Sequence, residues 1–258
     1  MNILPQEFKN AINLEYGKYK MSSRIIFVVI LILDLLVSFN PYSNSDFTPL
    51  LNYFYNEPFD YTAPATIPLS SGNVIYLVTT LALELVCAMA VGIFSGVLAS
   101  KYDVTRSMVG ETGVGKVTVG KCIIWILFVL LFAFPFMFSL VYMLIPTIFI
   151  LPAVIMLPSV YLNGNRNIFK SIGSCVWLMR RAYLKTMHII VLIYLSYYLI
   201  NLISNLLIYQ LSSPAAIVIS AFAEAWCWTA LGRFAAQRYS VLRLMKGANP
   251  LGTSNQDR

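Results

Sequence analysis

Long apolar runs separated by short polar segments dominate the pattern of this chain. A helix needs about 20 apolar residues to cross the roughly 30 Å hydrocarbon core of a bilayer. The uncharged run from Cys122 to Leu162 has 41 residues, enough for two such helices at about 1.5 Å per residue. The pattern therefore predicts an all-α, polytopic membrane protein with six transmembrane helices, at about 25–39, 73–100, 122–142, 145–162, 186–211 and 215–234.

The segments between these spans carry a second pattern. Residues 5–20 and 166–183 place apolar and basic residues on different sides of a helix, which predicts two amphipathic interfacial helices. A solvated helix fits residues 5–20 equally well. Asn40–Gly72 lacks Lys and Arg and contains several aromatic residues, so we expect it to fold onto the membrane surface or to cap the bundle.

Prolines and polar residues set the expected boundaries. We place the turn between the third and fourth spans near Tyr142–Pro146. Prolines 146, 152 and 158 predict a fourth span that is kinked or partly unwound. The sixth span is expected to continue as a helix through Lys246, so residues 1–246 form one transmembrane domain and residues 247–258 a disordered cytoplasmic tail.

Composition and charge agree with membrane insertion. Hydrophobic residues make up 59% of the chain and charged residues 11%, whereas soluble domains carry about 25% charged residues. With six spans and both termini cytoplasmic, all 18 Lys and Arg lie on the inner side, as the positive-inside rule expects. The net charge of +7 then matches anionic lipid headgroups, needs no nucleic-acid partner, and favours a bacterial inner membrane.

One face of the second span combines an acid with small residues. Counting by four from Glu84 gives Ala88, Gly92 and Gly96. Small residues allow close helix approach, and an intramembrane carboxyl needs protein around it. We therefore expect this helix at the centre of the bundle. A dimer packed through the Gly92 and Gly96 ridge remains an alternative.

The sixth span repeats this pattern with Ser220, Glu224 and Gly232, and Asp34 is a third intramembrane acid in the first span. We expect the second and sixth spans to lie side by side with their acids facing the interior. The fifth span adds a polar row, whose members are Tyr194, Tyr198, Asn201 and Asn205.

Two interpretations of these polar groups stay open. In the first they line a path for protons, cations or a polar headgroup. In the second the acids are protonated, hydrogen-bonded to Tyr, Asn and Ser, and hold the helices in register. The two carry about equal weight on the sequence alone.

The sequence contains little that indicates a nucleotide site, a metal site or a disulfide framework. The string GETGVGKV at Gly110–Val117 has the spacing of a phosphate-binding loop, but Val117 replaces the Ser or Thr, and spans rather than a strand and a helix flank it. One histidine and four scattered cysteines predict neither a zinc site nor a disulfide framework. We therefore expect no cofactor, no metal and no enzyme activity.

Basic residues of the inner loops are candidates for contact with a partner or with lipid. They are Lys101, Arg106, Lys116, Lys121, Lys170, Arg180 and Arg181.

Two family resemblances bear on the partners. The order of an amphipathic helix, a span, an outer loop, a second span and a basic loop ending in GKC resembles permease subunits of type-2 ABC exporters. That resemblance implies a cytosolic ATPase docked on Lys101–Lys121. The stretch Met156–Lys185 is instead similar to the six-span domains fused to some bacterial glycerophosphodiesterases, and it implies no single function.

Three hypotheses follow. The first is a permease or channel-like subunit of a transport system, acting with partner subunits or as a homo-oligomer. The alternative is a non-catalytic scaffold or accessory subunit that recruits partners through its basic inner face. An intramembrane lipid enzyme ranks last.

Overall fold

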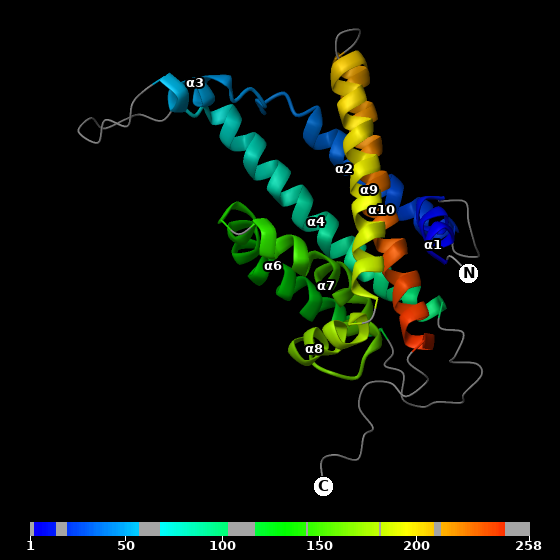
Figure 1. Ribbon diagram of the computed structural model, residues 1–258. Helices are drawn as coiled ribbons and strands as arrows, with labels where there is room; N and C mark the ends of the chain where they lie inside the picture. The colour runs from blue at the N-terminus through cyan, green and yellow to red at the C-terminus, as the bar shows by residue number, and fades with distance from the viewer. Residues whose placement is uncertain are drawn as a thin grey trace.

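The computed structural model describes residues 3–13, 20–56, 68–102, 117–142, 144–180, 182–208 and 213–245 (Figure 1). Every element in these ranges is a helix, which confirms the all-α prediction. The helices are α1 (Ile3–Ile12), α2 (Lys20–Ser38), α3 (Thr48–Asn56), α4 (Ser71–Tyr102), α6 (Val119–Tyr142), α7 (Leu144–Asn163), α8 (Ile168–Met179), α9 (Tyr183–Ile203) with a π-helical end η1 (Ser204–Ile208), and α10 (Ser213–Met245).

Within the described ranges, four helices are long and apolar enough to cross a membrane. They are Lys20–Ser38, Ser71–Tyr102, Tyr183–Leu206 and Pro214–Arg243. They match the predicted first, second, fifth and sixth spans, so this is an integral membrane protein with several spans. The predicted tail at 247–258 lies outside the described residues.

The α6–α7 pair occupies the range predicted for the third and fourth spans. α6 ends at Tyr142 and α7 begins at Leu144, so the break falls inside the predicted turn. α7 stays helical through Pro152 and Pro158, and the prediction of partly unwound backbone is wrong. Its second half is buried against neighbouring helices, and this packing keeps the backbone helical although two N–H donors are missing.

α10 lies at the centre of the bundle, where we expected α4 (Figure 1). It contacts α1, α2, α4, α7, α8 and α9. α10 itself carries small side chains on several of its sides, and these let the neighbouring helices approach closely. The buried alanines of α10 are Ala216, Ala221, Ala223, Ala225, Ala230, Ala235 and Ala236. The stripe on α4 covers one face only, which explains why α4 lies beside the centre instead.

The predicted packing residues of α4 act within one chain. A Cβ on Gly92 would lie 2.6 and 2.7 Å from the Cε2 and Cζ2 atoms of Trp125 on α6. A Cβ on Gly96 would lie 2.8 Å from the Cβ of Leu162 on α7. This ridge is therefore filled by α6 and α7, which leaves no room there for a second copy of the chain.

The contact between α4 and α10 uses the predicted glycine of α10. A Cβ on Gly232 would lie 2.8 Å from Val91 Cγ1 and 3.0 Å from Phe94 Cδ1. Ala88, the other predicted small residue on α4, is only half-buried. The expectation that the second and sixth spans lie side by side is confirmed.

Two polar side chains donate hydrogen bonds to carbonyl groups at the C-terminal end of α7. The buried Asn163 amide donates to the carbonyls of Gly96 at 2.9 Å and of Ser159 at 3.0 Å. The Lys121 ammonium donates to the carbonyls of Leu162 at 3.2 Å and Gly164 at 2.6 Å. A cation at a helix C-terminus satisfies its last carbonyls. Lys121 was expected to meet a partner or lipid, but it binds α7 instead.

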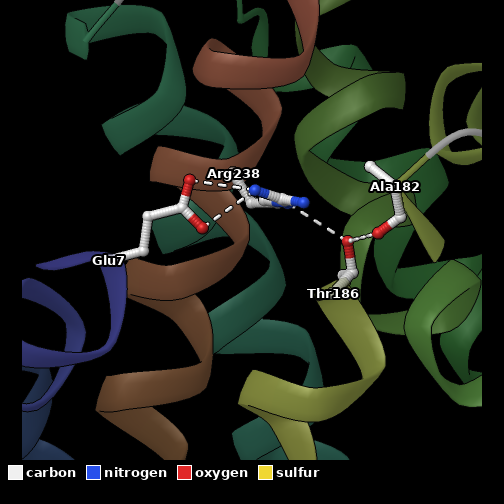
Figure 2. A network of polar contacts seen from close by, with 4 residues as sticks. All are labelled: Glu7, Ala182, Thr186 and Arg238. Carbon is white, nitrogen blue, oxygen red and sulfur yellow. Dashed lines mark hydrogen bonds and ion pairs between the residues drawn. The ribbon is translucent and has the colours of Figure 1, made fainter. Parts of the chain in front are cut away.

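α1 is held by a buried ion pair with α10, and a hydrogen bond from the same arginine connects the pair to α9 (Figure 2). The Arg238 Nη1 of α10 donates to both Glu7 oxygens of α1 at 2.9 Å. Its Nε donates to the Thr186 hydroxyl of α9 at 3.1 Å, and that hydroxyl donates to the Ala182 carbonyl at 2.9 Å. The Arg238 and Glu7 side chains are only 4% and 6% exposed.

Further contacts fix the direction of α1 along α10. Arg233 donates to the Asn10 carbonyl at 2.9 Å, and the Trp226 indole donates to the Ile12 carbonyl at 3.2 Å. Ala11 is fully buried in a cluster contributed by α9 and α10. α1 therefore runs antiparallel to α10, and its inner face packs on protein, whereas we expected a helix lying on the membrane surface or in solvent. Residues 14–19 of that expected helix lie outside the described residues.

Asn73 holds the segment after α2 against the start of α4. Its buried amide donates to the carbonyls of Asn44 and Asp46, both at 2.9 Å, and its Oδ1 accepts from Ser70. Asp46 accepts hydrogen bonds from Thr48 at the start of α3, which hold the pKa of this carboxyl below its usual range. Residues 44–47 of the Asn40–Gly72 connection therefore pack on the start of α4, which agrees with a capping role for this part of the connection.

Asn73→Asp should release this segment. The exchange removes both donated hydrogen bonds and turns a carboxylate towards two carbonyls, a loss of about 1–3 kcal/mol. The helix dipole at the start of α4 returns only about 0.3–1 kcal/mol. We expect faster protease cleavage within residues 40–47. Asn40→Asp is the matched control, because the Asn40 side chain accepts from the Tyr42 N–H at 3.0 Å and an aspartate can do the same. Equal cleavage of the two variants would contradict this role of Asn73.

Candidate functional site

Three carboxyl groups from distant parts of the chain, one each on α2, α4 and α10, interact electrostatically. Glu84 of α4 interacts electrostatically with Asp34 of α2, and Glu224 of α10 interacts with both. None of the three forms an ion pair within the described part of the chain. We call Asp34, Glu84 and Glu224 the carboxyl cluster.

The three carboxyls differ in burial. Asp34 is 5% exposed, its Oδ1 accepts from the Ser38 hydroxyl at 3.4 Å, and its Oδ2 has no hydrogen-bond partner among the described residues. Glu224 is half-buried and Glu84 is exposed. The expectation that the acids face the interior holds for Asp34 and in part for Glu224, but not for Glu84.

α9 adds polar groups to one side of this cluster. The Ser220 hydroxyl of α10 donates to the Asn201 Oδ1 of α9. Tyr197 shares a hydrogen bond with Asn201 and interacts electrostatically with Glu224 and Glu84. Tyr197 lies about two helical turns before η1, on the side of α9 from which its phenol interacts with Glu224 and Glu84.

The structure brings part of the predicted row on α9, Tyr194 and Asn201, to the acids and the facing side of α10. Tyr198 is 62% exposed and Asn205 is exposed, so both lie outside the cluster. Tyr197 was missed, although Tyr194, Tyr197 and Asn201 also lie at helical spacing (i, i+3, i+7). The sequence contains both rows and cannot choose between them, since that choice depends on how α9 is rotated against α10.

The three carboxyl groups of the cluster cannot all stay charged without compensation. Three negative charges near one another in apolar surroundings are costly without a cation, so protonation or a bound cation must relieve them. Among the described residues no three His, Cys, Asp or Glu side chains come close enough to bind a metal. The carboxyls thus interact electrostatically without forming a chelating set.

The predicted basic contacts divide into three groups. Lys101, Lys170 and Arg180 are exposed, and Lys121 binds the end of α7. Arg106, Lys116 and Arg181 lie outside the described residues, as do most of the Lys101–Lys121 docking segment and the Gly110–Val117 string.

The four cysteines are free, and those in the core are inert. Cys87, Cys175 and Cys227 are buried, and Cys122 is half-buried. Burial raises the pKa of the Cys175 thiol on α8 to about 12, so this group stays protonated at neutral pH.

Comparisons with protein-family models, curated proteins and solved structures find no match to this chain.

Proposed function

We propose that this protein is an integral membrane subunit of a transport system, permease-like or channel-like, whose polar path passes the carboxyl cluster. The supporting observation is that α2, α4 and α10 each bring one acid to the same place without a cation partner among the described residues. Intramembrane acids are costly and most often mark a path for ions or protons.

Protons are the ions this site fits best. Asp34 keeps one buried oxygen without a partner, while Glu84 is exposed and Glu224 lies between these extremes. Burial thus decreases from Asp34 through Glu224 to Glu84, and a proton can pass from one of these acids to the next. The described side chains offer no chelating set that would favour a metal ion.

The proposed topology has six spans with both termini cytoplasmic, in a bacterial inner membrane. Support comes from the docking of α1 on the C-terminal half of α10, which puts the first and last described helices at the same end of the bundle. The positive-inside rule would assign that end to the cytoplasm, because a six-span topology puts every Lys and Arg of the chain on this side.

The test is proton flux into liposomes that contain the purified chain and a trapped pH-sensitive dye, driven by a potassium diffusion potential. The wild-type chain should acidify the lumen faster than empty liposomes do. Glu84→Gln with Glu224→Gln should reduce the flux to that of empty liposomes, with helical content and elution volume unchanged. Asp46→Asn is the matched control, since this exposed acid lies outside the spans and should leave the flux unchanged.

A scaffold is the second candidate, and the exposed cations Lys101, Lys170 and Arg180 favour it. In that case the carboxyls are protonated and structural. Wild-type flux no greater than that of empty liposomes, together with a lower melting temperature of the double variant, would support the scaffold and reject the transport proposal. Retained flux in the double variant would reject the assigned path.

A further inference from the structure

The apolar side of α8 is exposed on the surface of the protein. The helix has 12 residues, about 18 Å, and is too short to cross a bilayer. Its buried side includes Ser171 and Ser174 among apolar neighbours. Its exposed side is apolar and aromatic, and comprises Phe169, Ile172, Val176 and Trp177. A helix facing water has the opposite arrangement, so something apolar must cover this side.

The exposed side of α8 continues onto α6. The Phe169 ring, 62% exposed, meets the rings of Phe128 and Phe132 edge-on, with centroids 6.5 and 6.4 Å apart. Phe128 and Phe132 are stacked at 4.4 Å. Leu127 and Leu131 extend this surface along α6, and both are exposed. We call this surface the α6–α8 face (Figure 1).

Cations border the α6–α8 face. Arg166 and Lys170 lie at the start of α8 and Arg180 follows its end, and all three are exposed. The sequence contains no Asp or Glu between residues 112 and 223. Lys170 follows the exposed Phe169 in the sequence, and Arg180 is one turn from Trp177. Aromatic rings beside cations and next to apolar residues are typical of protein surfaces at an anionic membrane interface.

We propose that the α6–α8 face binds an anionic phospholipid of the inner leaflet. The acyl chains lie against the phenylalanine and leucine side chains, and the negative charge of the headgroup is attracted by the cations near the two ends of α8, Lys170 and Arg180. This inference does not depend on the proposed transport function.

A second copy of the chain fits this surface poorly. Two-fold packing would bring each cation near its own symmetry mate, with no acid on this stretch of the chain to compensate. A phosphate headgroup supplies the missing negative charge.

Native mass spectrometry of the whole chain in detergent, titrated with phosphatidylglycerol or phosphatidylcholine, tests the proposal. We expect tighter binding of phosphatidylglycerol. Lys170→Gln with Arg180→Gln should weaken this preference roughly tenfold or more, since each basic residue near a membrane surface contributes about fivefold. Lys9→Gln with Lys20→Gln removes the same charge from exposed positions on α1 and α2, and should leave the preference unchanged.

A photoreactive amino acid in place of Val176 identifies what covers the face. Crosslinks to phosphatidylglycerol are the expected result. Crosslinks to a second copy of the chain would overturn the proposal in favour of self-association. Equal binding of the two lipids, or equal loss in the two double variants, would also overturn it.

Discussion

Glu7→Leu is expected to undock α1 from the bundle. The substitution leaves the Arg238 guanidinium buried without its counter-charge, and removing one partner of a buried ion pair costs about 3–5 kcal/mol. An isolated helix of ten residues is not stable in water, so α1 should unfold once it is released. Hydrogen exchange of the α1 amides should therefore accelerate strongly, while exchange in the centre of α10 changes little.

The reciprocal substitution should be milder. Arg238→Met leaves Glu7 unpaired, but a buried carboxyl can become neutral by binding a proton, which a guanidinium cannot lose. Thr186 keeps its hydrogen bond to the Ala182 carbonyl, so no second group is left without a partner. The combination Glu7→Leu with Arg238→Met replaces the pair by apolar groups of similar size and should restore slow exchange.

Lys9→Gln is the control, since Lys9 is an exposed residue of the same helix. The expected order of α1 exchange rates is Glu7→Leu fastest, then Arg238→Met, with the double variant near the wild-type chain. A double variant as fast as Glu7→Leu would mean that the ion pair does not hold α1.

Gly92→Ala should destabilise the packing between α4 and α6. The new methyl group would overlap the Trp125 indole, which is 5% exposed and cannot move far. Overpacking of this kind costs about 1–3 kcal/mol. We expect a melting temperature several degrees below that of the wild-type chain, measured by circular dichroism in detergent.

Gly173→Ala is the matched control, because nothing lies within 4 Å of its added Cβ. Alanine within an α-helix is favoured over glycine by about 0.5–1 kcal/mol, so this variant should melt slightly higher. Trp125→Leu should make room for the new methyl group, so the double variant should lose less stability than the two single variants together. A neutral Gly92→Ala, or strictly additive losses, would show that the ring is not packed against Gly92.

The carboxyl cluster could be predicted in part. Asp34, Glu84 and Glu224 stand out in the sequence because acids are rare in apolar runs, and the neighbourhood of α4 and α10 follows from their small residues. The unequal burial of these acids could not be predicted, because the exposure of Glu84 depends on how α2 and α9 pack beside the α4–α10 pair. Tyr197 and Tyr198 are separated by about 100° around α9, so only the helix rotation decides which one meets the acids.

The role of α1 was beyond sequence reasoning. Glu7 and Arg238 are 231 positions apart, and each looks like an ordinary surface charge in its own segment. Lys121 was misjudged for the same reason, because its carbonyl partners belong to the end of α7, 41 and 43 residues away. Such pairings depend on contacts between helices, which local spacing does not encode.

The sequence by itself determined that the chain is a helical membrane protein, where most helices begin and end, and which residues permit close packing. These properties depend on the length and composition of single segments, because each helix in a bilayer must satisfy its own backbone hydrogen bonds. Only the tertiary structure decided that α10 is the centre, that Gly92 and Gly96 receive Trp125 and Leu162, and that Glu7 pairs with Arg238. Those outcomes depend on the rotation and order of helices, which are set by side-chain packing between distant segments.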